Sequence, residues 1–286
     1  MWYLISILSG FFFASADALS KKVSGKIPAI VLAWVREAYA LPFLLPILLF
    51  IEIPALDRTF WLAIAICVLL DLGTTFLYMR AIQIAPLSLT VPYLGLTPIF
   101  LLIIPKIVLG ETLSLLGIIG VILISIGTYT LQIDRAKHGF FEPWLAIFKN
   151  RGSLYMFIVA VAYAVTSTFG KVAIQHSSPL FMTIVYFSLL GLGFVPIVLI
   201  TTRGKLRVLV QYPVAYFGIG AAMAAMAVTH FTAISMIQIA YMISIKRLSL
   251  LFAILYGWIL FKEENIRGRV AGGLIIIAGA TLIAFA

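Results

Sequence analysis

The chain has 286 residues, of which 63% are hydrophobic and only 10% are charged. A soluble globular domain carries roughly 45–50% apolar and about 25% charged residues, so this composition excludes an ordinary water-soluble fold. The formal net charge is +10, but the basic residues flank long apolar runs, which indicates orientation in a membrane and not nucleic-acid binding. The single cysteine, Cys67, excludes an intramolecular disulfide and a cysteine-rich metal site.

Ten apolar runs follow one another along the chain, each bounded by charged residues, proline or glycine. Each run is close to the roughly 20 residues that a helix needs to cross the hydrocarbon core of a bilayer, and none alternates as a barrel strand does. The sequence therefore predicts an all-α integral membrane protein with ten transmembrane helices. The runs lie at about 2–20, 28–50, 59–81, 86–105, 112–131, 154–174, 179–201, 213–236, 239–261 and 268–285.

The stretch between the fifth and sixth runs is the longest connection. We expect residues 132–151 to form a connecting loop, in which 142–149 can lie flat at the membrane interface with its aromatic residues toward lipid. This loop divides the chain into a first five-helix repeat, 1–131, and a second one, 152–286.

The two halves repeat each other with a nearly constant offset. Because each half holds an odd number of spans, the second half enters the membrane upside down, so the sequence predicts two inverted five-helix repeats around a central cavity. Near the start of each half the offset is 150 or 151, and farther on it is 152. The larger offset pairs Asp71 with Met223, Leu94 with Lys246, Thr97 with Ser249, Glu111 with Glu263, Gly120 with Gly272 and Gly127 with Gly279.

Charged residues inside the first three spans are candidates for the transport site, because an ionised group is costly in a membrane. Arg36 and Glu37 lie in the second span and Asp71 lies near the middle of the third. For Arg36 and Glu37 a structural ion pair is the open alternative. Asp71 is either a protonatable group of the cavity or a structural partner. Asp17 and Lys21 lie near a helix end, where we expect them to reach the interface.

The fourth span carries a polar stripe, since Thr90, Tyr93 and Thr97 recur at positions i, i+3 and i+7. Four prolines punctuate this span and predict a bent helix that lines the cavity. In the ninth span, Ser249 occupies the position equivalent to Thr97. Lys246 borders the same stripe, whereas Arg247 points away from it on an ideal helix. We predict that these residues also bind the solute.

Two groups of motifs resemble the EamA-type permeases of the drug/metabolite transporter superfamily. The segment 85–98 followed by Leu109-Gly110-Glu111 resembles their first repeat, and the segment 245–263 with Gly272 resembles their second. The resemblance covers the whole chain and implies a carrier of amino acids, metabolites, nucleotide sugars or sugar phosphates. The pair Lys246-Arg247 is similar to a dipeptide with which sugar-phosphate members hold phosphate.

Other ionisable residues are predicted to have structural roles. Glu111 and Glu263 open the fifth and tenth helices, where a carboxylate suits the positive end of the helix dipole, and they could close a gate with Lys106 and Lys262. The three histidines show no metal-binding spacing, and His230 is interpreted as a packing residue.

The sequence predicts a secondary active transporter that moves a small amino acid-like or anionic, phosphorylated solute by alternating access. One alternative is an exporter of cationic or drug-like compounds coupled to protons, and another is a membrane enzyme acting on a lipid. We expect no catalytic residue, no cofactor, no metal and no nucleic-acid partner. The expected partners are a small solute, the lipid bilayer and a coupling proton or counter-solute, and a homodimer is left open. The expected location is a prokaryotic inner membrane, crossed many times.

The loop charges bear on orientation. Most basic loop residues, among them Lys22, Lys149 and Arg207, fall on the loops that face the cytoplasm if both termini lie outside. The resemblance implies the opposite orientation, so this point stays open.

Overall fold

The computed structural model describes residues 1–85, 90–131, 150–203, 205–261 and 270–286. Within these ranges the chain is helical and contains no strand. The predicted interfacial helix at 142–149 and the predicted gate residues Lys262 and Glu263 lie outside the described residues.

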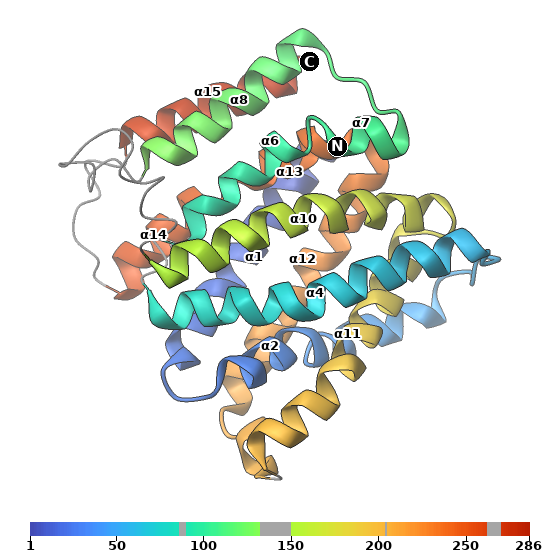
Figure 1. Cartoon of the computed structure of the whole chain (residues 1–286), viewed down its shortest axis with the longest axis vertical. Coiled ribbons are helices and arrows are strands. Elements are labelled where there is room, and N and C mark those ends of the chain that lie inside the picture. Colours follow the sequence, from blue (N-terminus) through green and yellow to red (C-terminus); the bar gives the residue numbers. More distant parts are fainter. Residues whose placement is uncertain (86–89, 132–149, 204, 262–269) are drawn as a thin grey trace.

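The helices follow the predicted apolar runs in order (Figure 1). The first half contains α1 (Trp2–Ser24), α2 (Ala29–Ala38), α3 (Leu41–Leu44), η1 (Leu45–Leu49), α4 (Arg58–Ile84), η2 (Val91–Leu96), α6 (Thr97–Phe100), α7 (Ile104–Leu109) and α8 (Leu115–Thr130). The second half contains α10 (Arg151–Gln175), α11 (Pro179–Thr202), η4 (Leu206–Leu209), α12 (Pro213–Met236), α13 (Ile239–Lys246), α14 (Ser249–Phe261) and α15 (Val270–Ala284).

Seven described segments are long and apolar enough to cross a membrane: Trp2–Ser24, Ala29–Leu49, Arg58–Ile84, Arg151–Gln175, Pro179–Thr202, Pro213–Met236 and Ile239–Leu260. Three shorter apolar segments, Tyr93–Leu109, Leu115–Thr130 and Ala271–Ala284, occupy the remaining predicted runs. The prediction of an all-helical membrane protein is therefore confirmed. The crossing of all ten segments as two inverted repeats stays a prediction.

Short polar side chains set where several helices begin. The Asp57 carboxylate accepts a hydrogen bond from the backbone N–H of Phe60 at 2.8 Å and starts α4. Ser178 accepts from Phe181 N–H at the start of α11, and Pro179 follows at the first helical position. Such caps satisfy backbone donors that have no partner inside the helix, and proline fits there because it lacks the N–H.

Proline breaks two of the spans in the first half. Pro42 and Pro46 divide the second span into α2, α3 and η1, and Pro92, Pro98 and Pro105 divide the fourth into η2, α6 and α7. A proline inside a helix removes a donor and its ring clashes with the preceding turn. The fourth span was predicted as one bent helix, but in the structure it is a series of short helical pieces.

The ninth span is broken as well, without a proline. At the junction of α13 and α14 the backbone tightens, since Leu248 N–H bonds to Ile245 O and Leu250 N–H bonds to Arg247 O, both three residues back at 3.0 Å. Gly10 of α1 packs against this junction. A methyl group at Gly10 would lie 2.7 Å from Lys246 O, so only glycine lets α1 approach so closely.

Helices α8 and α15 lie side by side at one edge of the molecule (Figure 1). Gly120 faces Gly279, and Gly127 faces Gly272, so the two helices are antiparallel. A methyl group on any of these glycines would lie 2.7–2.9 Å from the facing carbonyl oxygen. Small residues allow this close backbone approach between membrane helices.

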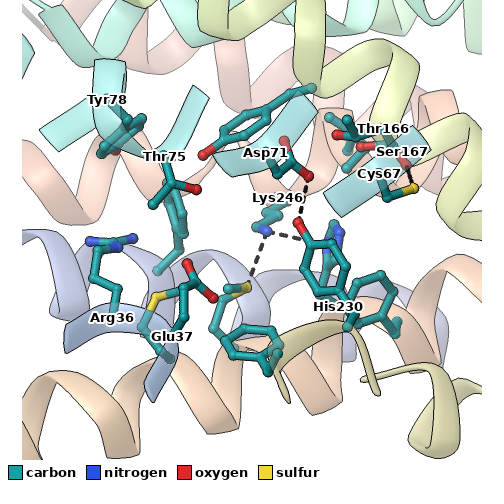
Figure 2. A pocket seen from close by; sticks show the side chains of 18 of the residues that line it. Arg36, Glu37, Cys67, Asp71, Thr75, Tyr78, Thr166, Ser167, His230 and Lys246 are labelled. Carbon is teal, nitrogen blue, oxygen red and sulfur yellow. Dashed lines mark hydrogen bonds between the residues drawn. The ribbon is translucent and has the colours of Figure 1, made fainter. Parts of the chain in front are cut away.

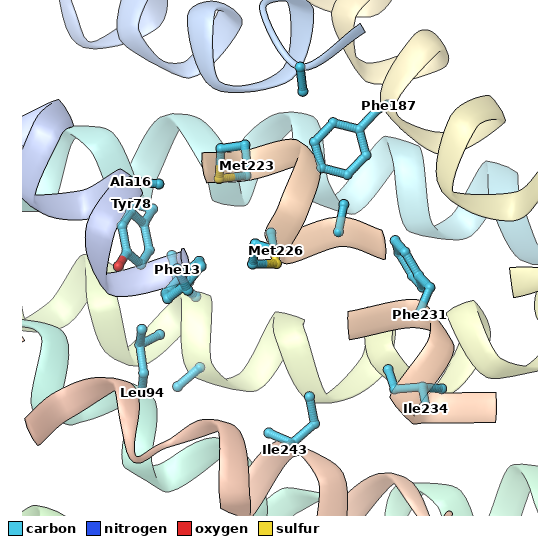
Figure 3. Close-up of a cluster of buried hydrophobic side chains, with 14 of the residues drawn as sticks. Phe13, Ala16, Tyr78, Leu94, Phe187, Met223, Met226, Phe231, Ile234 and Ile243 are labelled. Carbon is cyan, nitrogen blue, oxygen red and sulfur yellow. The ribbon is translucent and has the colours of Figure 1, made fainter. Parts of the chain in front are cut away.

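The remaining long helices surround the centre of the molecule. Phe13 of α1, Tyr78 of α4, Phe187 of α11, Met226 of α12 and Ile243 of α13 are buried together there (Figure 3). These helices also expose apolar side chains outward, as an environment of lipid requires. This ring of helices encloses the site described next.

Candidate functional site: a charged central cavity

A cavity lies between α1, α2, α4, α10, α11, α12 and α13. Five of the nine residues that the sequence predicts for substrate binding line it, and Figure 2 shows four of these projecting into the space. The five are Arg36, Glu37, Asp71, Lys246 and Arg247. The structure thus brings together charges from the second, third and ninth spans.

Arg36 is paired with Asp17 and not with Glu37. Its guanidinium lies 2.8 Å from Asp17 Oδ1, and both side chains are almost fully buried. Tyr78 donates its hydroxyl to the other Asp17 oxygen at 2.5 Å. The expectation that Asp17 reaches the interface is therefore wrong. The open alternative of a structural ion pair is therefore found for Arg36, but its partner is Asp17 of α1 and not the neighbouring Glu37. Consecutive residues on a helix point about 100° apart.

The two other acids of the cavity have different surroundings. Asp71 accepts hydrogen bonds from the hydroxyls of Tyr186 at 2.5 Å and Thr74 at 2.7 Å. Glu37 is 4% exposed, and its Oε2 has no hydrogen-bond partner. A buried polar atom without a partner is costly. Glu37 is therefore the carboxylate that is ready to accept a donor from a solute.

Lys246 has no carboxylate partner among the described residues. Its Nζ lies 3.1 Å from His230 Nδ1, 3.3 Å from Met226 Sδ and 4.9 Å from the centre of the Phe13 ring. Neither Glu37 nor Asp71 pairs with Lys246. The two acids instead face Tyr186, Thr74 and the open cavity (Figure 2).

Arg247 lines the same cavity, although an ideal helix would turn it away from the Lys246 side. Helix α13 ends at Lys246, and the tightened turn beyond it changes the direction of the next side chain. Arg247 is 3% exposed and its Nε has no hydrogen-bond partner. The break in the ninth span therefore presents two adjacent cations to one space.

The polar stripe of the fourth span lies outside the walls of this cavity. Thr90, Tyr93 and Thr97 are buried, as is Ser249, but none of the four lines it. The reason is the broken course of the fourth span, whose piece η2 packs against α10 and α8 instead of facing the centre. A role of these four residues in binding the solute stays a prediction.

Several lining residues were missed by the sequence reading. Cys67, Asp71 and Thr75 are spaced four residues apart on α4 and share one face of the helix. From Asp71, helical periodicity could therefore have predicted that Cys67 and Thr75 also line the cavity. On α12, Met223, Met226 and His230 likewise share one face. His230 was interpreted as a packing residue, but it lines the cavity and contacts Lys246. Tyr163, Thr166, Ser167 and Tyr186 complete the polar lining.

Glu111 bonds to a different lysine from the one expected. Lys171 of α10, and not Lys106, lies 2.5 Å from Glu111 Oε1, and Glu111 Oε2 accepts from Ile239 N–H at 3.1 Å. Lys171 also donates to Ile237 O at 2.7 Å. The carboxylate therefore joins the end of α10 to the start of α13, the helix that ends at Lys246.

In the part of the chain that the structure describes, no three side chains of His, Cys, Asp or Glu gather closely enough to hold a metal ion. Cys67 is a buried thiol that donates to Thr166 O at 3.3 Å.

The comparisons with known proteins agree with this architecture. The model of the EamA-like transporter family matches residues 1–132 and again residues 150–285. The chain therefore belongs to the EamA-like transporter family, a family of membrane transporters. A protein of known crystal structure shares the fold, with a TM-score of 0.73 and 14% identity over 99% of this chain and 96% of its own. A search of the curated proteins found no match.

Proposed function

We propose that this protein is a secondary active transporter that carries a small anionic or zwitterionic metabolite, either amino acid-like or phosphorylated, by alternating access. The observation that carries the proposal is the set of charges in the cavity that lack ionic partners among the residues that the structure describes. Lys246 and Arg247 form one pole, and Glu37 forms the other.

The cationic pole fits an anionic group of the solute. Two basic side chains that share one low-dielectric space and have no carboxylate at hydrogen-bond distance are costly when both are charged. A carboxylate or phosphate would satisfy Lys246 Nζ and the free Nε of Arg247 together. Arginine and lysine are the residues that bind such groups most strongly.

The anionic pole fits an amino group. Glu37 Oε2 is buried and has no donor. An ammonium group of the solute would supply one, while the anionic group of the same molecule contacts Lys246.

Two contacts that recur in both halves support the inverted repeats. Lys21 of α1 donates to Ala85 O at 3.1 Å, and its counterpart Lys171 of α10 donates to Ile237 O. The glycines on α8 and α15 also pair reciprocally: Gly120 is equivalent to Gly272 but faces Gly279, and Gly127 is equivalent to Gly279 but faces Gly272. Reciprocal contacts of this kind are typical of a two-fold relation between equivalent units. Lys21 therefore binds the carbonyl end of α4. Its reach to the membrane interface stays a prediction.

A second candidate function is the proton-coupled export of cationic or drug-like compounds. It is favoured by Glu37 together with the aromatic rings and methionines of the walls. Aromatic faces attract organic cations, and methionine adapts to ligands of different shape.

Uptake into proteoliposomes tests the proposal. The probes are ethanesulfonate, which is a fixed monovalent anion, taurine, which adds an amino group to it, and tetraethylammonium, which is a cation. We expect saturable uptake of the first two. Lys246→Ala removes the cation and should reduce this uptake by about tenfold or more, and a tenfold loss corresponds to ~1.4 kcal/mol. Lys246→Arg keeps the charge and should reduce the uptake less.

Lys106→Ala is the matched control, since Lys106 is an exposed lysine outside the cavity. Uptake of tetraethylammonium alone, unchanged in Lys246→Ala, would contradict the proposal and favour the second candidate.

A further inference from the structure

The contact between Lys246 and His230 restricts how many protons the two side chains can hold. Their nitrogens, Nζ and Nδ1, lie 3.1 Å apart at hydrogen-bond distance. A hydrogen bond needs a lone pair on one of the two atoms, and an ammonium group has none. If Lys246 is charged, His230 Nδ1 must therefore be the unprotonated acceptor. In this arrangement the pair carries no more than one positive charge.

The surroundings of the pair reinforce this limit. Lys246 also faces Met226, the Phe13 ring and, at longer range, the cations Arg36 and Arg247. Asp17 acts electrostatically on Lys246, but Arg36 and Tyr78 already occupy the Asp17 oxygens. His230 faces Lys246, Arg247 and the ring of Phe231. A second positive charge on the pair would meet cations without a new counter-ion.

We propose that Lys246 and His230 together form the proton-coupling site of the carrier, where one proton binds with each anionic solute. The inference rests on the proposed function. An anionic group that approaches Lys246 draws the ammonium away from His230 Nδ1. The freed nitrogen then takes a proton from the water of the cavity, and the anion neutralises the added charge.

The charges balance through the cycle. In the empty carrier the pair consists of a charged lysine and a neutral imidazole, with a net charge of one. In the loaded carrier it consists of a charged lysine, an imidazolium and a monovalent anion, which again leaves a net charge of one. When the anion leaves on the other side, the imidazolium proton returns to water and Lys246 donates to His230 again. The movement of solute and proton is therefore electroneutral.

Linkage makes this coupling measurable in equilibrium binding. If the anion promotes protonation of His230, then a lower pH must strengthen binding of the anion by the same factor. Histidine is the side chain whose ordinary range suits such a role near neutral pH.

Titration calorimetry of the purified full chain with ethanesulfonate tests the coupling. This probe keeps its charge near neutral pH, so protons taken up on binding come to the protein. Measuring the heat in buffers of different ionisation enthalpy gives the number of protons. We expect about one proton per bound anion in the wild type. In His230→Gln we expect weaker binding without proton uptake, because an amide can accept from Lys246 but does not titrate.

The matched control is His176→Gln, since His176 bonds to Asp57 outside the cavity and its replacement should leave the uptake unchanged. Binding without proton uptake in the wild type, or unchanged uptake in His230→Gln, would overturn the inference and leave the proposed function intact. Absence of any binding would instead contradict the anion site of the proposed function.

A second measurement does not depend on a folded His230 variant. In wild-type protein with isotope-labelled histidine, NMR should show that one imidazole becomes imidazolium when ethanesulfonate is added. The three histidine signals are assigned with His176→Gln and His138→Gln. Histidine signals that keep their protonation state at saturating probe would also overturn the inference.

Discussion

The two halves of the chain build opposite sides of one cavity from related helices but with different chemistry. The first half lines it with Glu37, Asp71 and Arg36, whose charge is paired with Asp17, and the second half lines it with Lys246, Arg247 and His230. Asp71 on α4 corresponds to Met223 on α12, and both line the cavity. The backbone plan repeats, whereas the charges do not. This difference in charge is what the proposed binding of an asymmetric solute by its two ends requires.

The fourth and ninth spans show the same contrast. Both are broken, but the fourth breaks at prolines and packs outside the cavity, while the ninth tightens at Arg247 and presents its cations to the centre. Leu94, the counterpart of Lys246, is fully buried among apolar residues. Of these two equivalent residues, the one in the first half therefore packs against apolar side chains, and the one in the second half lines the cavity.

The largest expected effect comes from breaking the ion pair that joins α1 and α2. Asp17→Ala should destabilise the fold by about 3–5 kcal/mol, because it leaves the buried guanidinium of Arg36 without its partner. Thermal unfolding in detergent measures this, and the double variant Asp17→Ala/Arg36→Met should recover part of the loss. Equal stability of Asp17→Ala and wild type would show that Arg36 finds another counter-charge.

The acidic side of the comparison is tested by Glu37→Gln. If Glu37 binds the amino group of a zwitterion, the variant should bind taurine about tenfold more weakly, which corresponds to ~1.4 kcal/mol. Binding of ethanesulfonate should change little, because that probe lacks the amino group. Calorimetry with the matched probes measures the difference. An equal loss for both probes would assign Glu37 a structural role.

The variant Asp71→Asn tests whether Asp71 or the pair of Lys246 and His230 takes up the coupling proton. The Asp71 oxygens already accept from Tyr186 and Thr74, so we expect the variant to keep proton uptake on binding and to lose only a few degrees of melting temperature. Loss of proton uptake at unchanged anion binding would place the coupling group on the acidic side. The buffer-dependent calorimetry used for His230 gives this readout directly.

The smallest effect belongs to a contact outside the membrane, where the two halves meet at the surface. The backbone N–H of Phe60 and the His176 ring beside Asp57 lower the pKa of that carboxyl. A depressed pKa in the folded state stabilises the protein above the carboxyl's unfolded value of about 4, and this gain is lost as the pH falls through the lower folded value. Asp57→Asn should therefore lower the melting temperature slightly above about pH 4, and the difference from wild type should shrink as the pH falls further. Identical profiles of variant and wild type between about pH 3 and pH 6 would contradict it.

The apolar runs alone determined the class of fold. Long stretches without charge have to be helical in lipid, because each backbone donor and acceptor needs a partner within its own segment. Because a buried charge is costly, the sequence also predicted five charged site residues, and all five line the cavity. They are Arg36, Glu37, Asp71, Lys246 and Arg247. These are local properties, and each can be read from one span at a time.

Only the tertiary structure decided which charges meet. Asp17 was placed at a helix end from its position in the first span, but packing of α1 against α2 brings it to Arg36. His230 reaches the cavity because α12 and α13 lie beside each other, whereas Thr90, Tyr93 and Thr97 lie outside the cavity walls because prolines break their span. Helical periodicity gives the direction of a side chain around its own axis. It contains no information on which neighbouring helix lies in that direction, and that choice follows from the packing of the whole bundle.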